Sequence, residues 1–108
     1  MAKHEYCYLY LTCDSENEAT KIADVLLEKR LIACAKQISL SAKYHWQGDI
    51  EQAKEILLMM ESRLDLFDEI ESEVGKLHSY DTFVLEAIPV KKVSQKALEW
   101  MEKELSDD

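Results

Sequence analysis

The alternation of apolar and polar side chains divides the first half of the chain into two strands and a helix. Residues 6–12 form a run of aromatic and aliphatic side chains, which predicts a strand buried on both faces. Ser15 and Glu18 have the spacing of a capping box, and the apolar positions that follow recur every three to four residues. A helix is therefore expected to begin there and to end near Arg30. Residues 32–46 alternate between two faces, as a strand does.

The second half of the chain repeats this succession of strand and helix. Gln47, Gly48 and Asp49 predict a tight turn that leads into a returning strand over residues 50–61. A helix over residues 64–77, a strand over residues 83–89 and a last helix capped by Ser94 complete the order β-α-β-β-α-β-α. This order predicts an α+β domain of ferredoxin-like architecture, with helices on one face of an antiparallel sheet. No linker composition interrupts residues 1–108, so one domain is expected, ordered over residues 5–105 and frayed from residue 104 onward.

The central hairpin is too long for one subunit of this size. Residues 32–46, if fully extended, span about 50 Å at roughly 3.3 Å per residue. A globule built from such a chain is only about 35 Å across. The hairpin must therefore bend or project, and its unpaired edges favour contact with further copies of the chain. Tyr44 and Trp46 at its tip are expected in that interface, although they could also stack on a ligand between subunits.

The charge of the chain narrows the range of partners. The chain has 22 Asp and Glu residues against 13 Lys and Arg residues, a formal net charge of -9. Such a surface repels nucleic acid and anionic membranes and attracts cations, although acidity also simply keeps a small protein soluble. The three cysteines show no C-x-x-C spacing, and no signal peptide or membrane span is apparent, so a reduced, cytoplasmic protein is expected.

Two residues are the best candidate metal ligands. His78 and Cys13 offer an imidazole and a thiol, which suit copper or zinc. Each also has a purely structural interpretation, because a histidine is favoured at a helix C-terminus and a lone buried cysteine commonly fills space. No G-x-S-x-G or glycine-rich loop is present, and Cys34 with His78 is conceivable as a nucleophile pair, although the sequence cannot bring the two together. Neither an enzyme nor an organic cofactor is predicted.

From about Cys7 to Leu105 the sequence resembles the CutA family of divalent-cation-tolerance proteins. The landmarks are spread over the chain in order: Thr12 before an acidic helix start, EKRLIACA at 28–35, YHWQG at 44–48, Glu55, HSY at 78–80, IPV at 88–90 and Trp100. The resemblance implies a ferredoxin-like subunit in a homotrimer, similar in architecture to PII-type signalling proteins. It also implies a role in tolerance of metal ions, copper above all, with no established reaction. Tyr80 joins Tyr44 and Trp46 as a residue expected at the trimer interface or in a cleft between subunits.

The sequence departs from the family pattern near the copper ligands of some members. The first-strand cysteine of those members corresponds to Leu11, with Cys13 two residues further along, and of their histidine pair only His78 remains. The departures together are Leu11, Leu77, Ser79 in place of a proline, Glu61 in place of a lysine, and Val84 in place of a glutamate. Three functions follow as hypotheses: a non-catalytic copper-tolerance trimer, a PII-like sensor of a small molecule or anion, and a structural trimer that scaffolds a partner.

Overall fold

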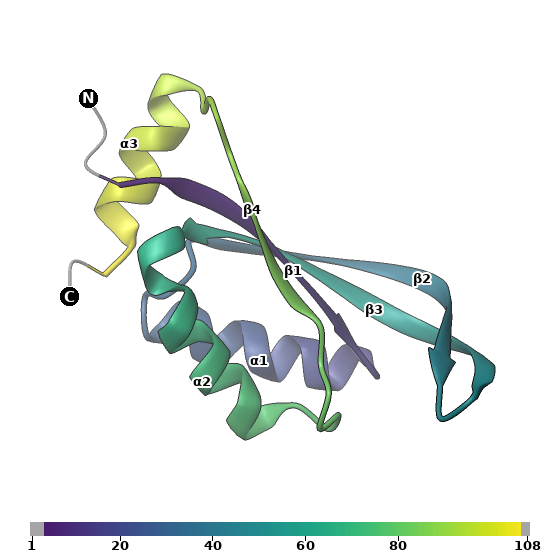
Figure 1. Ribbon diagram of the computed structural model, residues 1–108. Coiled ribbons are helices and arrows are strands. Elements are labelled where there is room, and N and C mark those ends of the chain that lie inside the picture. Colours follow the sequence, from purple (N-terminus) through teal and green to yellow (C-terminus); the bar gives the residue numbers. More distant parts are fainter. Residues whose placement is uncertain (1–3, 107–108) are drawn as a thin grey trace.

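The computed structural model describes residues 4–106 and shows a sheet with helices on both sides (Figure 1). In chain order the elements are β1 (Tyr6–Cys13), α1 (Glu16–Glu28), β2 (Cys34–Trp46), β3 (Asp49–Arg63), the short 3-10 helix η1 (Leu64–Leu66), α2 (Phe67–Leu77), β4 (Leu85–Pro89) and α3 (Gln95–Glu104). The strands form one antiparallel sheet in the order β2-β3-β1-β4. The predicted ferredoxin-like α+β architecture is therefore confirmed.

The helices do not all lie on one face of the sheet. Helices α1 and α2 cover one face, whereas α3 lies across the end of the opposite face (Figure 1). The strand β1 shows the consequence: Cys7, Leu9, Leu11 and Cys13 face α1 and α2 and are at most 1% exposed. The alternate residues of β1 from position 8 onward are only half-buried. The expectation of a strand buried on both faces is therefore wrong for the single subunit, because α3 reaches only the first part of β1.

The β2–β3 hairpin projects from the domain as its length predicts. The two strands pair continuously from Cys34 with Glu61 to Trp46 with Asp49, and the molecule measures 48 × 25 × 21 Å along its principal axes. The turn at the tip is two residues long, and both of them have positive φ, 49° at Gln47 and 87° at Gly48. This is the turn conformation that matches the twist of a hairpin.

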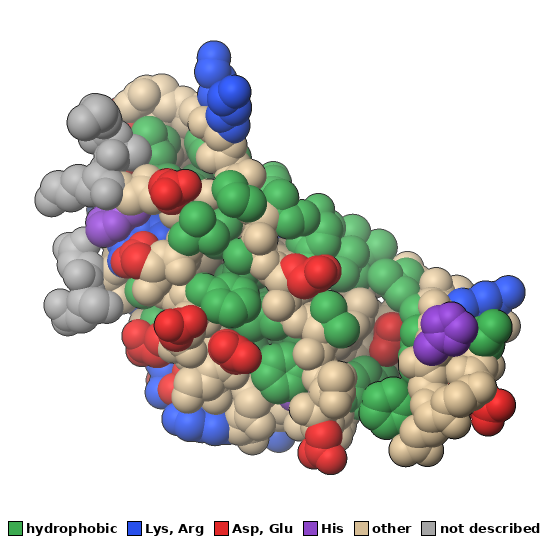
Figure 2. Space-filling model, viewed as in Figure 1, with side chains coloured by type: hydrophobic (Ala, Val, Ile, Leu, Met, Phe, Trp, Pro, Cys, Tyr) green, Lys and Arg blue, Asp and Glu red, His purple; other side chains and the backbone are tan. Residues whose placement is uncertain are grey.

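The face of the sheet opposite α1 and α2 carries a row of apolar side chains beyond α3. We call it the open face and define it by Tyr8, Tyr10, Ile38, Leu40, Leu57, Met59 and Ile88. Ile38 and Ile88 are 49% and 44% exposed, and the other members are half-buried. Figure 2 shows hydrophobic side chains gathered along the sheet between α3 and the hairpin. An apolar face of this extent favours a covering partner.

The remaining differences from the predicted elements have local causes. The chain at 64–66 forms a 3-10 turn, so α2 begins at Phe67, and β4 begins at Leu85. Ser94 precedes α3, but its side chain makes no capping hydrogen bond.

The C-terminal segment is held more firmly than predicted. Leu105 is buried at 3% exposure, and the backbone oxygen of Ser106 accepts a hydrogen bond of 2.6 Å from Arg63 Nη2. The Ser106 amide in turn donates to the backbone oxygen of Arg30 at 2.8 Å. The fraying expected from residue 104 is therefore wrong as far as residue 106. Positions 107 and 108 lie outside the described residues.

Candidate metal centre

Three potential ligands meet where β1 ends, α1 begins and α2 ends. Cys13 is the last residue of β1, Glu18 lies in the first turn of α1, and His78 directly follows α2. The cysteine sulfur, a carboxylate oxygen and a ring nitrogen of these residues all lie within 4.8 Å of one another. The structure thus brings together the two candidates named from the sequence and adds Glu18 to them.

Glu18 connects the start of α1 to the turn after α2. The Ser15 hydroxyl accepts a hydrogen bond from the Glu18 amide at 3.2 Å, as in a capping box. The Glu18 carboxylate reaches one residue further back than the motif predicts and accepts from the Asp14 amide at 3.0 Å. Its second oxygen accepts from the Ser79 amide at 2.6 Å. The sequence indicated Glu18 only as a helix cap, because the role it shares with Ser79 depends on tertiary structure.

The His78 ring is fully buried, and both of its nitrogens have hydrogen-bond partners. Its Nε2 lies 2.9 Å from the backbone oxygen of Thr12, and its Nδ1 accepts from the Tyr80 amide at 3.0 Å. Because a carbonyl oxygen can only accept, these partners assign a neutral ring with the proton on Nε2. The ring also stacks on Phe83, with centroids 5.3 Å apart.

The electrostatic state of the three groups is set by burial and by backbone donors. Burial raises the pKa of the Cys13 thiol to about 12, and the charges of Glu18 and Glu55 add to the effect, so the thiol is protonated at neutral pH. Burial also acts to raise the pKa of Glu18, but the hydrogen bonds that its carboxylate accepts from Asp14 and Ser79 lower it overall. Glu18 Oε2 lies 3.9 Å from His78 Nδ1.

Thiolate, imidazole and carboxylate together form a donor set that suits zinc or copper, and the three residues present fit such an ion in chemical type. Cys13 would supply sulfur, His78 a nitrogen through Nδ1, and Glu18 an oxygen. A metal ion held there would supply a fixed positive charge to the site. Two local changes are required first: the Cys13 thiol must lose its proton, and the Tyr80 amide must release Nδ1.

A second network adjoins this cluster through Tyr80. The Tyr80 hydroxyl donates to Glu55 Oε2 at 2.9 Å and lies 3.4 Å from Asp14 Oδ1. Burial, the hydrogen bond to Glu55 and nearby negative charge raise the pKa of the phenol far above its usual range. Glu55 is only 7% exposed. In the sequence, Glu55 stands out only as a landmark of the family resemblance.

The aromatic residues of the hairpin are not part of the metal cluster. Tyr44 and Trp46 are 40% and 48% exposed near the tip of the hairpin. Tyr44 is near enough to Tyr80 to contribute to the raised pKa of its phenol.

Cys34 is also remote from the cluster. Cys34 pairs with Glu61 in the ladder, whereas Cys13 pairs with Ile56 five positions along β3, so the conceivable Cys34–His78 nucleophile pair is not formed. Cys34 is half-buried.

Comparison with known proteins decides the family. The family model described as CutA1 divalent ion tolerance protein matches residues 7–104 of this chain. The chain belongs to the CutA1 family. Its similarity to two archaeal members extends over most of the length of both chains. A divalent-cation tolerance protein CutA from Archaeoglobus fulgidus is 36% identical over 95 residues, which cover 88% of this chain and 93% of that protein.

Two further comparisons agree with this assignment. The divalent-cation tolerance protein CutA of Pyrococcus horikoshii is 36% identical over 93 residues, or 86% of this chain and 91% of that protein. A solved structure of the A. fulgidus protein, described as a periplasmic divalent cation tolerance protein CutA, superposes with a TM-score of 0.91 at 34% identity. It covers 94% of this chain and 99% of that one. In the part of this CutA1-family protein that the structure describes, no helix is long and apolar enough to cross a membrane.

Proposed function

We propose that this protein binds divalent cations, copper among them, as a non-catalytic homotrimer, and that Cys13, Glu18 and His78 are the ligands. The observation that carries the proposal is the convergence of a sulfur, an oxygen and a nitrogen donor within 4.8 Å in a member of a divalent-ion-tolerance family. The net charge of -9 supports it, because it raises the local concentration of cations.

The departures from the family pattern are compatible with a shifted thiol. Leu11 and Cys13 lie on the same face of β1, since side chains alternate along a strand, and both are 0% exposed. Leu11 is part of the apolar core, whereas Cys13 at the end of the strand adjoins His78. The thiol at Cys13 therefore takes the place of the one missing at position 11.

The trimer is supported by the open face and by the projecting hairpin. The open face presents its apolar row next to a hairpin that makes the molecule 48 Å long, and a further copy would cover this surface. Tyr44 is near Tyr80, and Trp46 lies two residues further along β2, so all three are candidates for the surface where copies would meet.

A metal titration tests the ligand assignment. Apoprotein titrated with Co²⁺ is expected to bind one ion per chain and to develop a near-ultraviolet charge-transfer band from thiolate to metal. Cys13→Ser should abolish the band. Cys7→Ser is the matched control, because Cys7 is equally buried on the same face of β1 but lies at the other end of the strand. Equal band intensity in wild type and Cys13→Ser would refute the assignment of Cys13.

Copper binding is tested separately at the histidine. Titration of His78→Ala with copper should show one equivalent fewer per chain than wild type, with circular dichroism confirming that the variant is folded. An unchanged stoichiometry would remove His78 from the ligand set.

A second candidate function, a small-molecule sensor, is favoured by the Tyr80 network. Glu55 is a buried carboxylate whose hydrogen-bond donor in the structure is the Tyr80 hydroxyl, and a ligand donor there would compensate its charge further. A nucleotide or amine that raises the melting temperature of wild type saturably, but not that of Tyr80→Phe, would support this function over metal binding. If no compound shifts the melting temperature while metal binds as described above, the sensor function is excluded. If the protein responds to neither compounds nor metals, the scaffold hypothesis is left.

We also propose a cytoplasmic location. Cys7, Cys13 and Cys34 are all free thiols, which fits a reducing compartment. Cell fractionation that recovers the protein outside the cytoplasm would contradict this assignment.

A further inference from the structure

The chain between α2 and β4 is held in place by the candidate metal ligands themselves. Residues 79–82 belong to no helix or strand, and within the described chain their backbone makes no hydrogen bond to other backbone groups. Two of their amides donate to side chains instead: Ser79 to Glu18 Oε1 at 2.6 Å, and Tyr80 to His78 Nδ1 at 3.0 Å. We call this arrangement of residues 79–82 the closed position. It depends on the same side chains that would hold an ion.

The His78 ring has one lone pair to offer, and the Tyr80 amide occupies it. The other nitrogen, Nε2, carries the proton and lies 2.9 Å from the backbone oxygen of Thr12, so Nδ1 is the atom that can bind a metal ion. One nitrogen lone pair cannot accept a hydrogen bond and coordinate an ion at the same time. An ion on Nδ1 and the hydrogen bond from the Tyr80 amide therefore exclude each other.

The side chain of Tyr80 stabilises the closed position at a second point. Its hydroxyl donates to Glu55 Oε2 at 2.9 Å, and its ring packs against the His78 ring with centroids 4.9 Å apart. Glu55 is buried on β3, and a buried carboxylate that loses its hydrogen-bond donor is destabilised. Release of Tyr80 therefore costs free energy, and this cost opposes metal binding.

We propose that residues 79–82 form a switch with two exclusive positions: the closed one, and a released one in which His78 Nδ1 holds a divalent ion. The inference rests on the proposed metal binding and adds that Tyr80 and Glu55 determine its affinity. Coupling of this kind is reciprocal. A small molecule that requires the closed Tyr80–Glu55 pair and a metal ion on His78 therefore weaken each other's binding by the same factor.

Amide hydrogen exchange tests the switch directly. In the metal-free protein the Tyr80 amide should exchange slowly, because it is hydrogen-bonded to His78 Nδ1. Saturation with Zn²⁺ should speed its exchange, measured by NMR, roughly tenfold or more, whereas a ligand that only stabilises the fold slows exchange. The His78 amide is the control, since it donates to the backbone oxygen of Val74 at 2.9 Å and should not exchange faster.

Two variants separate the switch from simple electrostatic attraction. Tyr80→Phe should tighten Co²⁺ binding about tenfold, because it removes a hydrogen bond to a charged group that exists only in the closed position. Glu55→Gln should also tighten binding, about threefold, because a neutral acceptor makes a weaker bond to the Tyr80 hydroxyl. If Glu55 acted only by attracting cations, Glu55→Gln would weaken Co²⁺ binding, and that result would overturn the switch.

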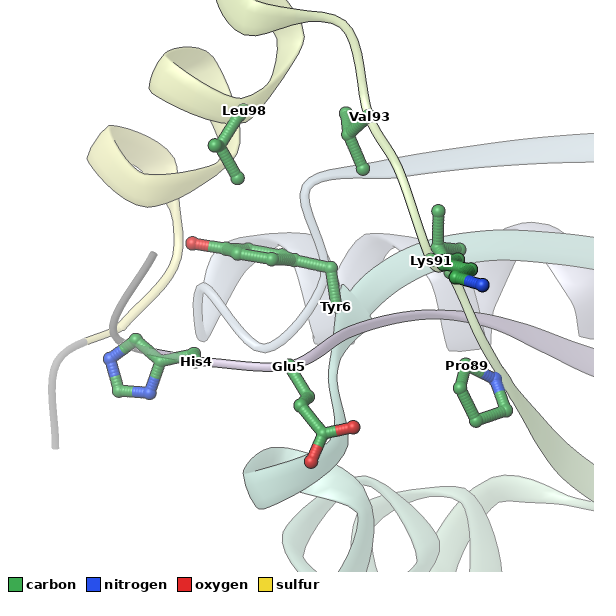
Figure 3. A pocket seen from close by; sticks show the side chains of 8 residues that line it. His4, Glu5, Tyr6, Pro89, Lys91, Val93 and Leu98 are labelled. Carbon is green, nitrogen blue, oxygen red and sulfur yellow. The ribbon is translucent and has the colours of Figure 1, made fainter. Parts of the chain in front are cut away.

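Tyr6→Phe is the matched control for Tyr80→Phe. Tyr6 lines a pocket of about 460 Å³ beside α3, where its ring faces Leu98 and Val93 (Figure 3). Among the described residues, its hydroxyl is the one buried side-chain polar atom that makes no hydrogen bond. Tyr6 begins β1, whereas Cys13 ends that strand. The substitution should leave Co²⁺ affinity unchanged, and a gain equal to that of Tyr80→Phe would contradict the role of the Tyr80 hydroxyl.

The charge-transfer band of bound Co²⁺ distinguishes failure of the switch from failure of the metal site. If the band forms in wild type but Zn²⁺ leaves the exchange of the Tyr80 amide unchanged or slows it, the switch is overturned and the proposed metal site stands. If neither ion binds, both are overturned.

Discussion

At the scale of single residues, the candidate site depends on Glu18 as well as on the two residues that the sequence singled out. His78 and Cys13 could be named from their side-chain chemistry alone. Glu18 could not, because its sequence context is that of a helix cap, and its bond to the Ser79 amide joins residues 61 positions apart. The buried His78 ring is held by backbone groups of Thr12 and Tyr80, which no spacing in the sequence reveals.

Acid stability tests the role of Glu18. The pKa of Glu18 is lowered in the folded protein. Its carboxylate therefore stabilises the fold at pH values above the usual pKa of a glutamate, and this stabilisation is lost as the pH falls through the folded-state pKa. Glu18→Gln should lower the free energy of unfolding of the metal-free protein by about 1–2 kcal/mol at neutral pH. The difference from wild type should shrink below pH of about 4, and urea denaturation at several pH values measures it.

Glu16→Gln is the control for this prediction. Glu16 occupies the same first turn of α1, so it shares the helix dipole but is exposed. If Glu16→Gln and Glu18→Gln lower the free energy of unfolding equally and with the same pH dependence, the link between α1 and the turn after α2 contributes nothing to stability.

At the scale of elements, the local signals predicted most boundaries within two residues. Alternation identified both long strands, and the turn residues placed the hairpin tip. The end of α1 is instructive, because no glycine marks it. Arg30 adopts a φ of 57°, and the Leu31 and Arg30 amides return to the Leu26 and Leu27 oxygens. The position of α3 on the opposite face of the sheet could not be predicted, because the apolar stripe of this helix indicates only that one side of the helix is buried.

The hairpin turn provides a prediction at this scale. Gly48→Ala should lower the free energy of unfolding by about 1 kcal/mol, because φ is +87° there and no atom lies within 4 Å of an added Cβ. The cost is then conformational and not steric. Gln47→Asn should be neutral or stabilising, since asparagine tolerates positive φ. Thermal unfolding of both variants measures this, and equal effects of the two would contradict the assignment of the turn.

At the scale of the whole molecule, the sequence showed that one subunit cannot cover its own hairpin. The length of residues 32–46 predicted the overhang, and the long axis of 48 Å confirms it. The sequence could not predict where the uncovered surfaces lie. That depends on α3 covering only one end of the open face, and on the pocket that this leaves beside Val93.

Trp46→Ala should weaken the association between copies of the chain. The indole is 48% exposed in the subunit, and its removal deletes apolar area that a neighbouring copy would bury. Light scattering over a dilution series should show dissociation at a concentration at least tenfold higher than for wild type. Trp100→Ala is the matched control, because Trp100 is similarly exposed, at 41%, but lies on α3. An equal effect of the two substitutions would contradict a specific role of the tip.

The mass of the protein in dilute solution tests the account most directly. Sedimentation equilibrium at micromolar concentration should give three times the mass of the chain, with no dependence on added metal. A stable, folded monomer under the same conditions would contradict the claim that copies of the chain cover the open face and the hairpin.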